Sequence, residues 1–446
     1  MHKNENIKVI EKELGTRLLV LKGGVWTLFG FGSNQVLRLL SNLLLTHLLA
    51  PDIFGLMALV SIFITGLQMF SDLGIGQCII QNPRGDEPQF LNTAFSMQII
   101  RGVFLWLASC ALAYPFSLIY NQSGLFYLIP IASLSTVIAG FANTAIWSLT
   151  RHVQLGKVII LNTLSNFVGV GVSIIWALVH PTVWVIVGGN LAMVTCECIG
   201  SHFLLQSRNW PQWDLNARKS ILGFGKGIFL SSATWFLAGQ AERLILGRFV
   251  SLAWLGVFSI ALLLAESVSN AFQEVISRAI FPTIAKSLRE NRVQALRQHE
   301  KMRWAVLLTT ITLAILIIAA AKPIVGLVFN AKYQEASWMI QILILRTVIG
   351  MIWYPNAMLL MADARLKYFP VGNIARFVMI SVGTIAAFRF YNSYVAVWVL
   401  GLASIPSYAA VSWGIHNHFK EIFRKEMLVA FIALLAICCY ALLYHR

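Results

Sequence analysis

Charged side chains inside long apolar runs are the residues of this chain whose type and spacing could do chemistry. Five of them fall near the middle of such a run: Arg38, Glu197, Glu266, Arg346 and Arg376. An ionised group inside an apolar helix is costly, so it usually faces a water-filled cavity, an oppositely charged partner or a ligand. Arginine keeps its charge inside a protein, and the three arginines therefore need carboxylates, water or an anionic ligand.

Five more ionisable residues lie nearer the ends of apolar runs. Asp72, Arg101 and Lys226 fall near the end predicted to be cytoplasmic, and Glu242 and Arg243 near the opposite end. We expect Arg101 and Lys226 to guide an anionic ligand toward the central arginines. Asp72, Glu242 and Arg243 are candidates for structural or gating roles, and Asp72 could cap or pair where its helix ends.

Two interpretations of the central residues stay open. In the first, Arg38, Arg346 and Arg376 line a water-filled cavity and bind the phosphate groups of a ligand, because guanidinium donors match phosphate oxygens in a forked geometry. Glu197 and Glu266 are then candidates for coupling to a proton or an ion. In the second, the charges form structural ion pairs, such as Arg346 with Glu266.

The elements that position these residues are predicted to be membrane-spanning helices. Of the 446 residues, 58% are hydrophobic and 12% are charged, and the mean hydropathy is +0.73. A soluble domain carries roughly 25% charged residues. A membrane barrel would show shorter alternating segments than these continuous apolar runs. We therefore predict an all-α polytopic membrane protein with about 13 transmembrane helices, in a range of about 12 to 14, since each crossing takes roughly 20 apolar residues. The predicted crossings are 23–49, 53–78, 92–119, 124–150, 157–179, 182–206, 221–249, 253–280, 303–325, 335–361, 368–391, 393–415 and 427–445.

Several other classes of protein lack the features that they would require. The sequence contains no G-x-x-x-x-G-K-[ST] phosphate loop, and its longest connection between apolar runs, residues 281–302, is too short for a catalytic domain. We therefore expect neither an enzyme nor a bound cofactor. The cysteines fit small core residues, and Cys196 and Cys198 lie on diverging helix faces, so no metal site is expected.

The distribution of Lys and Arg predicts the orientation. With the N-terminus in the cytoplasm, the cytoplasmic segments hold 23 Lys and Arg residues and the opposite connections hold four. Topology thus accounts for most of the net charge of +16 and leaves little for binding nucleic acid. Residues 1–22 alternate basic and apolar side chains, which is typical of a short amphipathic helix on a membrane surface.

A weak internal repeat relates the two halves of the chain. After a shift of 201 residues, Phe54-Gly55-Leu56 aligns with Leu255-Gly256-Val257. Six predicted crossings separate the copies, so the halves share an orientation, as in transporters built from parallel repeats. We therefore predict two six-helix lobes around a central cavity. The predicted segments are an amphipathic N-terminal segment (1–22), a first lobe (23–207), a cytoplasmic linker (208–220), a second lobe (221–415) and a cytoplasmic loop with an added helix (416–446).

Several motifs resemble those of a known family. Residues 43–56, LLLTHLLAPDIFGL, resemble the L-x-P-x-x-F-G corner of bacterial polysaccharide transporters, and residues 70–102 continue the match. Residues 240–248, QAERLILGR, look like the Q-x-D-R-L-I-L-G motif of the same proteins. The chain therefore resembles the polysaccharide transport (Wzx-type oligosaccharide or lipopolysaccharide flippase) family of the multidrug/oligosaccharidyl-lipid/polysaccharide exporter superfamily.

The resemblance implies two helix bundles that alternate between inward-open and outward-open forms. It also implies a substrate: an undecaprenyl-pyrophosphate-linked oligosaccharide that crosses the bacterial cytoplasmic (inner) membrane for polysaccharide, O-antigen or exopolysaccharide biosynthesis. Cavity cations would hold the pyrophosphate, and coupling to Na⁺ or H⁺ is expected. The implied partners are the lipid-linked oligosaccharide, membrane lipids and other polysaccharide assembly proteins.

Two other functions stay open. A drug/cation antiporter of the same superfamily would favour an acidic, aromatic cavity, and the arginines argue against it. A membrane-embedded polysaccharide polymerase or glycosyltransferase would need a long outer loop with catalytic acids, whereas the outer connections here are short. For Trp147, Trp235 and Trp353, contact with a sugar and packing between helices are equal alternatives.

Overall fold

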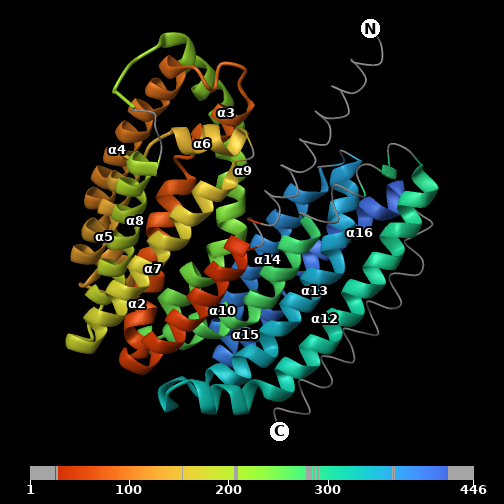
Figure 1. The fold of residues 1–446 in the computed structure, drawn as a ribbon. Helices are drawn as coiled ribbons and strands as arrows, with labels where there is room; N and C mark the ends of the chain where they lie inside the picture. Colours follow the sequence, from red (N-terminus) through yellow and green to blue (C-terminus); the bar gives the residue numbers. More distant parts are fainter. Residues whose placement is uncertain are drawn as a thin grey trace. The chain divides into compact units, whose positions relative to one another are not determined.

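The structure, a computed structural model, describes residues 26, 29–152, 154–204, 209–277, 284, 287–288, 291–363, 365 and 367–419. Every regular element within these ranges is a helix (Figure 1), which confirms the predicted all-α class. The predicted amphipathic segment at 1–22 and the predicted added helix at 427–445 lie outside the described residues.

Eight helical segments of the described chain are long and apolar enough to cross a membrane. A ninth is obtained if α5 (Leu125–Gly140) and α6 (Ala145–Arg151), bent by 64° at a short break, count as one span. The described residues thus account for eight or nine of the roughly 13 crossings expected from the apolar content. The eight are α2 (Pro51–Met69), α4 (Pro88–Tyr120), α7 (Leu155–Val179), α8 (Trp184–Leu204), α12 (Arg292–Val328), α13 (Ala336–Ala362), α14 (Tyr368–Phe390) and the pair α15–α16 (Ser393–His418).

The chain divides into two compact units. Unit 1 comprises residues 1–49 and 63–233, and unit 2 comprises residues 50–62 and 234–446. Helix α2 and helix α9 (Leu215–Phe249) each contribute to both units. The lobe boundaries expected from the sequence stay predictions.

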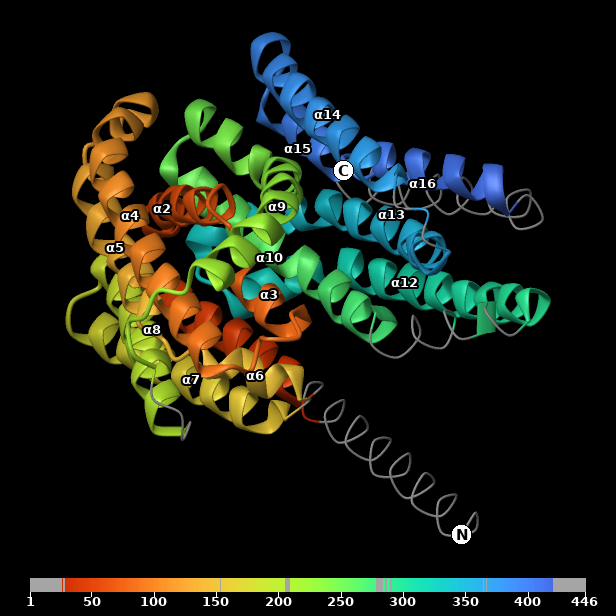
Figure 2. The same cartoon turned by 90° about the horizontal axis from the view of Figure 1, so that it is seen from above.

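Unit 1 is built around a layer of long helices. Helix α4 packs on α5, α5 on α8, and α8 on α7 (Figures 1 and 2). The short helices α3 (Ile75–Gln81) and α6 pack on each other, and α3 also packs on α4. Proline at the start of α4 suits its position, because the first turn of a helix has no use for the missing N–H.

The second predicted crossing, residues 53–78, is two helices rather than one. Helix α2 ends at Met69, and α3 begins at Ile75. Gly74, the residue directly before α3, adopts a left-handed conformation with φ of 56°, which suits glycine. The Asp72 Oδ1 atom accepts a hydrogen bond from the Gly74 N–H at 2.9 Å and stabilises the turn.

Unit 2 is organised around α13, its most deeply buried helix. In the most apolar stretch of α13, 78% of the residues are buried, against 22% for α14. Helix α13 packs on α10 (Leu252–Val275), α12, α15 (Ser393–Gly401) and α16 (Ile405–His418). A short 3-10 helix, Ala331–Tyr333, joins α12 to α13. The apolar surroundings of α13 make any charge on it expensive unless it is paired.

The two aligned glycines of the internal repeat meet in unit 2. A Cβ atom added to Gly55 would lie 1.9 Å from the Leu252 carbonyl oxygen, and one added to Gly256 would lie 2.0 Å from the Pro51 carbonyl oxygen. The first turns of α2 and α10 therefore touch backbone to backbone. Only glycine at both positions permits this separation.

Candidate functional site

A cavity with both polar and apolar lining residues lies within unit 1. It has a volume of about 510 Å³ and is lined by the end of α2, by α3 to α8 and by the connections between them. Three charged residues line it: Asp72, Arg101 and Glu197. With all three ionised, two negative charges and one positive charge leave the wall with a net charge of −1. A pocket of this size lies in the range of roughly 300–1,000 Å³ that small-molecule sites occupy.

Arg101 of α4 holds the end of α2 in place. Its Nε atom donates to the Ser71 carbonyl oxygen at 2.8 Å, and its Nη2 atom donates to the Gln68 carbonyl oxygen at 2.8 Å. The last carbonyls of a helix lack partners within the helix, and a cation there is favourable. Two of the five N–H donors of Arg101 are therefore used to hold the α2 end. The sequence predicts an entry role for Arg101, and the structure adds this anchoring role.

Asp72 also has structural partners on both oxygens. Besides the Gly74 N–H, it accepts a hydrogen bond from the Ser232 hydroxyl at 3.1 Å through Oδ2. This geometry matches the capping or pairing role considered from the sequence. Lys226 is in the same unit, but its side chain lies outside the described part of the chain.

Glu197 of α8 has a different environment. Within the described residues it forms no ion pair. Its polar neighbour is the side-chain amide of Asn162 on α7. With the amide oriented for this contact, the Asn162 nitrogen donates to Glu197 Oε1 at 3.3 Å. Both residues line the cavity. A carboxylate in an apolar helix that faces a cavity with no cation beside it is a candidate for binding a proton, an ion or a ligand.

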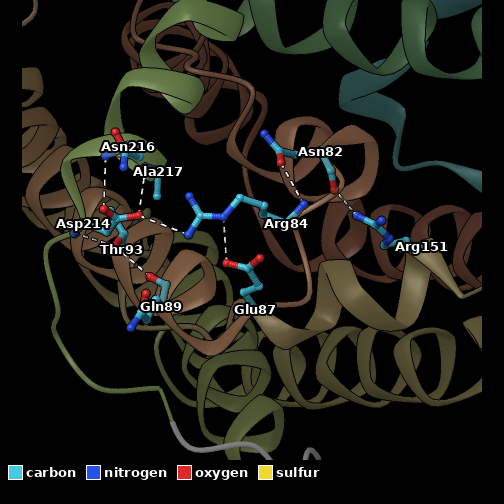
Figure 3. Close-up of polar contacts among 9 residues, drawn as sticks. All are labelled: Asn82, Arg84, Glu87, Gln89, Thr93, Arg151, Asp214, Asn216 and Ala217. Atoms are coloured by element: carbon cyan, nitrogen blue, oxygen red, sulfur yellow. Dashed lines mark hydrogen bonds and ion pairs between the residues drawn. The ribbon is translucent and has the colours of Figure 1, made fainter.

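Next to α3 and α6, the connections of unit 1 carry a network of exposed ion pairs (Figure 3). Arg84 Nε lies 2.7 Å from Glu87 Oε2, and Arg84 Nη2 lies 3.5 Å from Asp214 Oδ2. Arg151 donates to the Asn82 carbonyl oxygen. These residues fall on connections predicted to be cytoplasmic, and sequence reasoning did not single them out.

Two acids of these connections have lowered pKa values. The backbone N–H of Asn216, followed by that of Ala217 and the charge of Arg84, lowers the pKa of Asp214 below its usual value. Partial burial works in the opposite direction for Asp86, but the Ser148 hydroxyl and the nearby His152 and Arg151 still lower its pKa. Both carboxylates are therefore ionised at neutral pH.

The segment 209–214, within the predicted linker, is fixed to α4 by side chains. Ser96 Oγ accepts from the Gln212 N–H at 2.9 Å, Asn92 Oδ1 from the Trp210 N–H at 3.1 Å, and Thr93 Oγ1 from the Asp214 N–H at 3.0 Å. The non-helical backbone of this segment thus obtains hydrogen-bond partners from side chains of α4. Residues from Leu215 onward already belong to α9.

A second group of charges lies in unit 2, between four helices. Arg346 of α13 forms an ion pair with Glu242 of α9 and a second one, at 2.9 Å, with Glu266 of α10. The side chains of Glu242 and Arg346 are only 1% and 9% exposed. Arg376 of α14 is within electrostatic reach of all three, and its buried Nε has no hydrogen-bond partner among the described residues. Two acids and two arginines make this cluster neutral.

The remaining predicted residues are dispersed. Arg38 is exposed on the helical segment 29–48 of unit 1. Arg243 of unit 2 donates to Gln240 Oε1 at 3.2 Å, and its Nε is buried without a hydrogen bond. Unit 2 thus unites Arg346, Arg376, Glu242 and Glu266, while Arg38 and Arg101 belong to unit 1. The described residues contain no group of three or more His, Cys, Asp or Glu residues arranged to hold a metal ion.

Comparisons with known proteins give a consistent result. The model of a family described as polysaccharide biosynthesis protein matches residues 44–338, which is more than half of the chain. A curated relative, the teichuronic acid biosynthesis protein TuaB of Bacillus subtilis (strain 168), is 19% identical over 382 residues, covering 83% of this chain and 78% of that protein.

Two solved structures share the fold. The lipid II flippase MurJ in an inward closed conformation is similar with a TM-score of 0.66 and 11% identity, covering 95% of this chain and 97% of that chain. An inward-facing multidrug resistance MATE family transporter of the MOP superfamily gives a TM-score of 0.63 and 14% identity, covering 90% of this chain and 95% of that chain. At these identities the likeness shows the fold.

Proposed function

Because the chain belongs to the family of polysaccharide biosynthesis proteins, we propose that it moves a lipid-linked oligosaccharide across the bacterial cytoplasmic membrane by alternating access. The observation that carries this proposal is the family match over residues 44–338 in a chain that folds like a lipid II flippase. The proposed substrate is an oligosaccharide on undecaprenyl pyrophosphate, and the proposed direction is from the cytoplasmic to the periplasmic leaflet. The N-terminus is then cytoplasmic.

The geometry changes the roles proposed for the central arginines. Arg346 has its donors directed at Glu242 and Glu266, so it is a structural cation in this proposal. Arg376, which has no carboxylate in hydrogen-bonding contact within the described residues, and the exposed Arg38 are the proposed ligands of the pyrophosphate. The Nε donor of Arg376, which has no hydrogen-bond partner in the described part of the chain, remains available to a phosphate oxygen.

The two carboxylates that are candidates for ion coupling, Glu266 and Glu197, also differ in their surroundings. Glu266 already has a cationic partner, since it lies 2.9 Å from Arg346. Glu197 has an amide neighbour and faces a cavity, so it is the proposed coupling residue for H⁺ or Na⁺. Proton and ion relays in membrane helices commonly use such carboxylates.

The test is deletion of the gene followed by analysis of lipid extracts. Loss of the protein is expected to cause accumulation of a lipid-linked oligosaccharide and loss of the surface polysaccharide. Restoring the wild-type chain reverses both effects. Restoring an Arg376→Ala variant at equal expression gives at most partial reversal, while the matched control Arg389→Ala, exposed at the other end of α14, gives full reversal. A deletion strain that accumulates no such intermediate contradicts the proposal.

One observation favours a second function, export of cationic drugs. The cavity of unit 1 is lined by two acids, one arginine and an aromatic residue, Trp147, and the fold is shared with a multidrug resistance transporter. Drug export predicts that overexpression raises resistance to cationic dyes without any effect on polysaccharide. The flippase proposal predicts unchanged resistance.

A further inference from the structure

The cavity of unit 1 offers few cations to a pyrophosphate. Its charged lining comprises Asp72, Glu197 and Arg101, and the guanidinium of Arg101 already donates to two main-chain carbonyls of the α2 end. An anion placed there would face two acidic side chains and one cation, two of whose five N–H donors are already used. The head group of the proposed substrate has a second chemical part, the uncharged sugar rings, and the question is whether the cavity suits them.

The uncommitted groups on the cavity wall are amides and an indole. The side chains of Gln68, at the end of α2, and of Gln77, in α3, line the cavity, and neither amide forms a hydrogen bond with any described residue. Each amide offers two donors and one acceptor at neutral charge, which matches sugar hydroxyl groups that both donate and accept. Phosphate-binding sites use cations and main-chain N–H groups instead.

Trp147 of α6 supplies an aromatic face. It lines the cavity and is 37% exposed. Its ring packs against Gly76 so closely that a Cβ atom added to that glycine would lie 2.6 Å from the ring. The glycine backbone thus supports the indole, and the short helix α6 fixes the position of the side chain. The negatively polarised face of an indole attracts the partly positive C–H groups along one face of a pyranose ring.

We propose that this cavity binds a sugar ring of the carried oligosaccharide, with Trp147 as the stacking platform and Gln68 and Gln77 as the hydroxyl partners. The inference rests on the proposed function and assigns the sugar and the pyrophosphate to different residues. The sugar would bind in unit 1, whereas one of the proposed pyrophosphate ligands, Arg376, belongs to unit 2. The volume of about 510 Å³ limits the cavity to a small part of the glycan.

Cys198 provides a reporter for occupancy. It lines the same cavity, next to Glu197, whereas Cys110 on α4 is partly exposed and does not line it. The full-length protein in lipid nanodiscs is treated with N-ethylmaleimide, and modification of each cysteine is quantified by peptide mass spectrometry. The probe is the free oligosaccharide, released by mild acid from the lipid-linked intermediate of the deletion strain and freed of phosphate. Inorganic pyrophosphate and tetraphenylphosphonium serve as the anionic and cationic comparisons.

The expected result is that the free oligosaccharide at millimolar concentration slows modification of Cys198 and leaves Cys110 unchanged, while pyrophosphate and tetraphenylphosphonium have no effect. Trp147→Ala is expected to raise the half-protecting concentration by about 3- to 10-fold, the equivalent of one aromatic stacking contact. Trp147→Phe, which keeps an aromatic face, has a smaller effect and covers the case in which the alanine variant fails to fold. Trp176→Ala, a partly exposed tryptophan of α7 outside the cavity lining, is the matched control and leaves protection unchanged.

The outcomes separate the inference from the function on which it rests. A deletion strain that accumulates lipid-linked oligosaccharide, together with a free oligosaccharide that gives no protection of Cys198, overturns the sugar site and leaves the flippase function intact. Protection by pyrophosphate or by tetraphenylphosphonium, but not by the oligosaccharide, assigns the cavity to an anion or a cation and also overturns it. A deletion strain with no accumulated intermediate overturns the proposed function and the inference with it.

Discussion

Glu197 in unit 1 and Glu242 in unit 2 are both carboxylates on largely apolar helices, but their surroundings differ. Glu197 lines a cavity and has an amide neighbour. Glu242 is 1% exposed and forms an ion pair with Arg346, which also pairs with Glu266. The two acids and two arginines of the unit 2 cluster balance one another, whereas the cavity wall of unit 1 has two acids and one arginine. A buried charge that is neutralised mainly serves structure, and one that faces a cavity can exchange its partner.

The comparison is tested most strongly by removing the shared cation of unit 2. Arg346→Met leaves the buried carboxylate of Glu242 without a partner, so we expect the protein to lose about 3–5 kcal/mol of stability. Thermal unfolding monitored by size-exclusion chromatography in detergent measures the effect as a large fall in Tm. Arg346→Lys keeps the charge but cannot direct forked donors to two acids, so it gives a smaller fall. An unchanged Tm for Arg346→Met shows that the cluster is not structural.

The backbone contact of unit 2 gives the next largest effect. Gly55→Ala places a Cβ atom 1.9 Å from the Leu252 carbonyl oxygen, which neither helix can avoid without a backbone shift. We expect a loss of about 1–3 kcal/mol, the usual cost of overpacking. Gly223→Ala is the control, since a Cβ atom there has open space around it. Equal values of Tm for the two variants contradict the close packing described for α2 and α10.

Neutralising the cavity carboxylate should separate function from stability. Glu197→Gln removes a charge that has no cation partner among the described residues, so we expect Tm to change by little. Surface polysaccharide output should nevertheless fall severalfold if Glu197 couples transport to H⁺ or Na⁺. Output is measured at matched protein levels against Glu335→Gln, a carboxylate at the start of α13. If Glu197→Gln lowers Tm as much as Arg346→Met does, the proposed difference between the carboxylates of the two units is contradicted.

The exposed network of unit 1 should give the smallest effect, and one that depends on pH. The pKa of Asp214 is lower in the folded protein than that of a free aspartate, about 3.9, so its contribution to stability is fully present above that pH. The contribution is lost as the pH falls below about 4, through the lowered folded pKa. Asp214→Asn is therefore expected to lower Tm slightly at pH 7, and the difference from the wild type should shrink as the pH falls below about 4. A difference that grows on acidification contradicts this sign.

Much of the fold follows from local patterns in the sequence. The apolar runs predict the long helices, and the structure places α7 and α14 within two residues of the predicted bounds at each end. The divisions of two predicted crossings were not foreseen. The break between α2 and α3 depends on the positive φ of Gly74, and the 64° bend between α5 and α6 lies at a break around Asn143, whose side chain accepts the Ala145 N–H at 2.9 Å. The apolar composition of these runs predicts neither helix break.

The site residues were identifiable by type but not by partner. The pairing of Arg346 with Glu266 was one of the open interpretations, because both lie mid-run in the sequence. The part played by Glu242 was not foreseen, since it lies 104 residues from Arg346 in the chain and was placed near a helix end. The cavity of unit 1 depends on side chains from the α2 end to α8, and Gln68 and Gln77 carry no sequence signal that distinguishes them from other polar residues.

The contact of Gly55 with Gly256 restricts the substitutions that these two positions can accept during evolution. Each glycine faces main-chain atoms of the opposite helix, and those atoms are the same for every amino acid. A side chain gained at one position therefore cannot be accommodated by a smaller residue at the other. Substitution of Gly55 or Gly256 should therefore reduce function. In a screen for second-site revertants, no single side-chain substitution elsewhere on the two facing turns should restore the function of such a variant. The aligned corners of the two halves are thus constrained to remain alike.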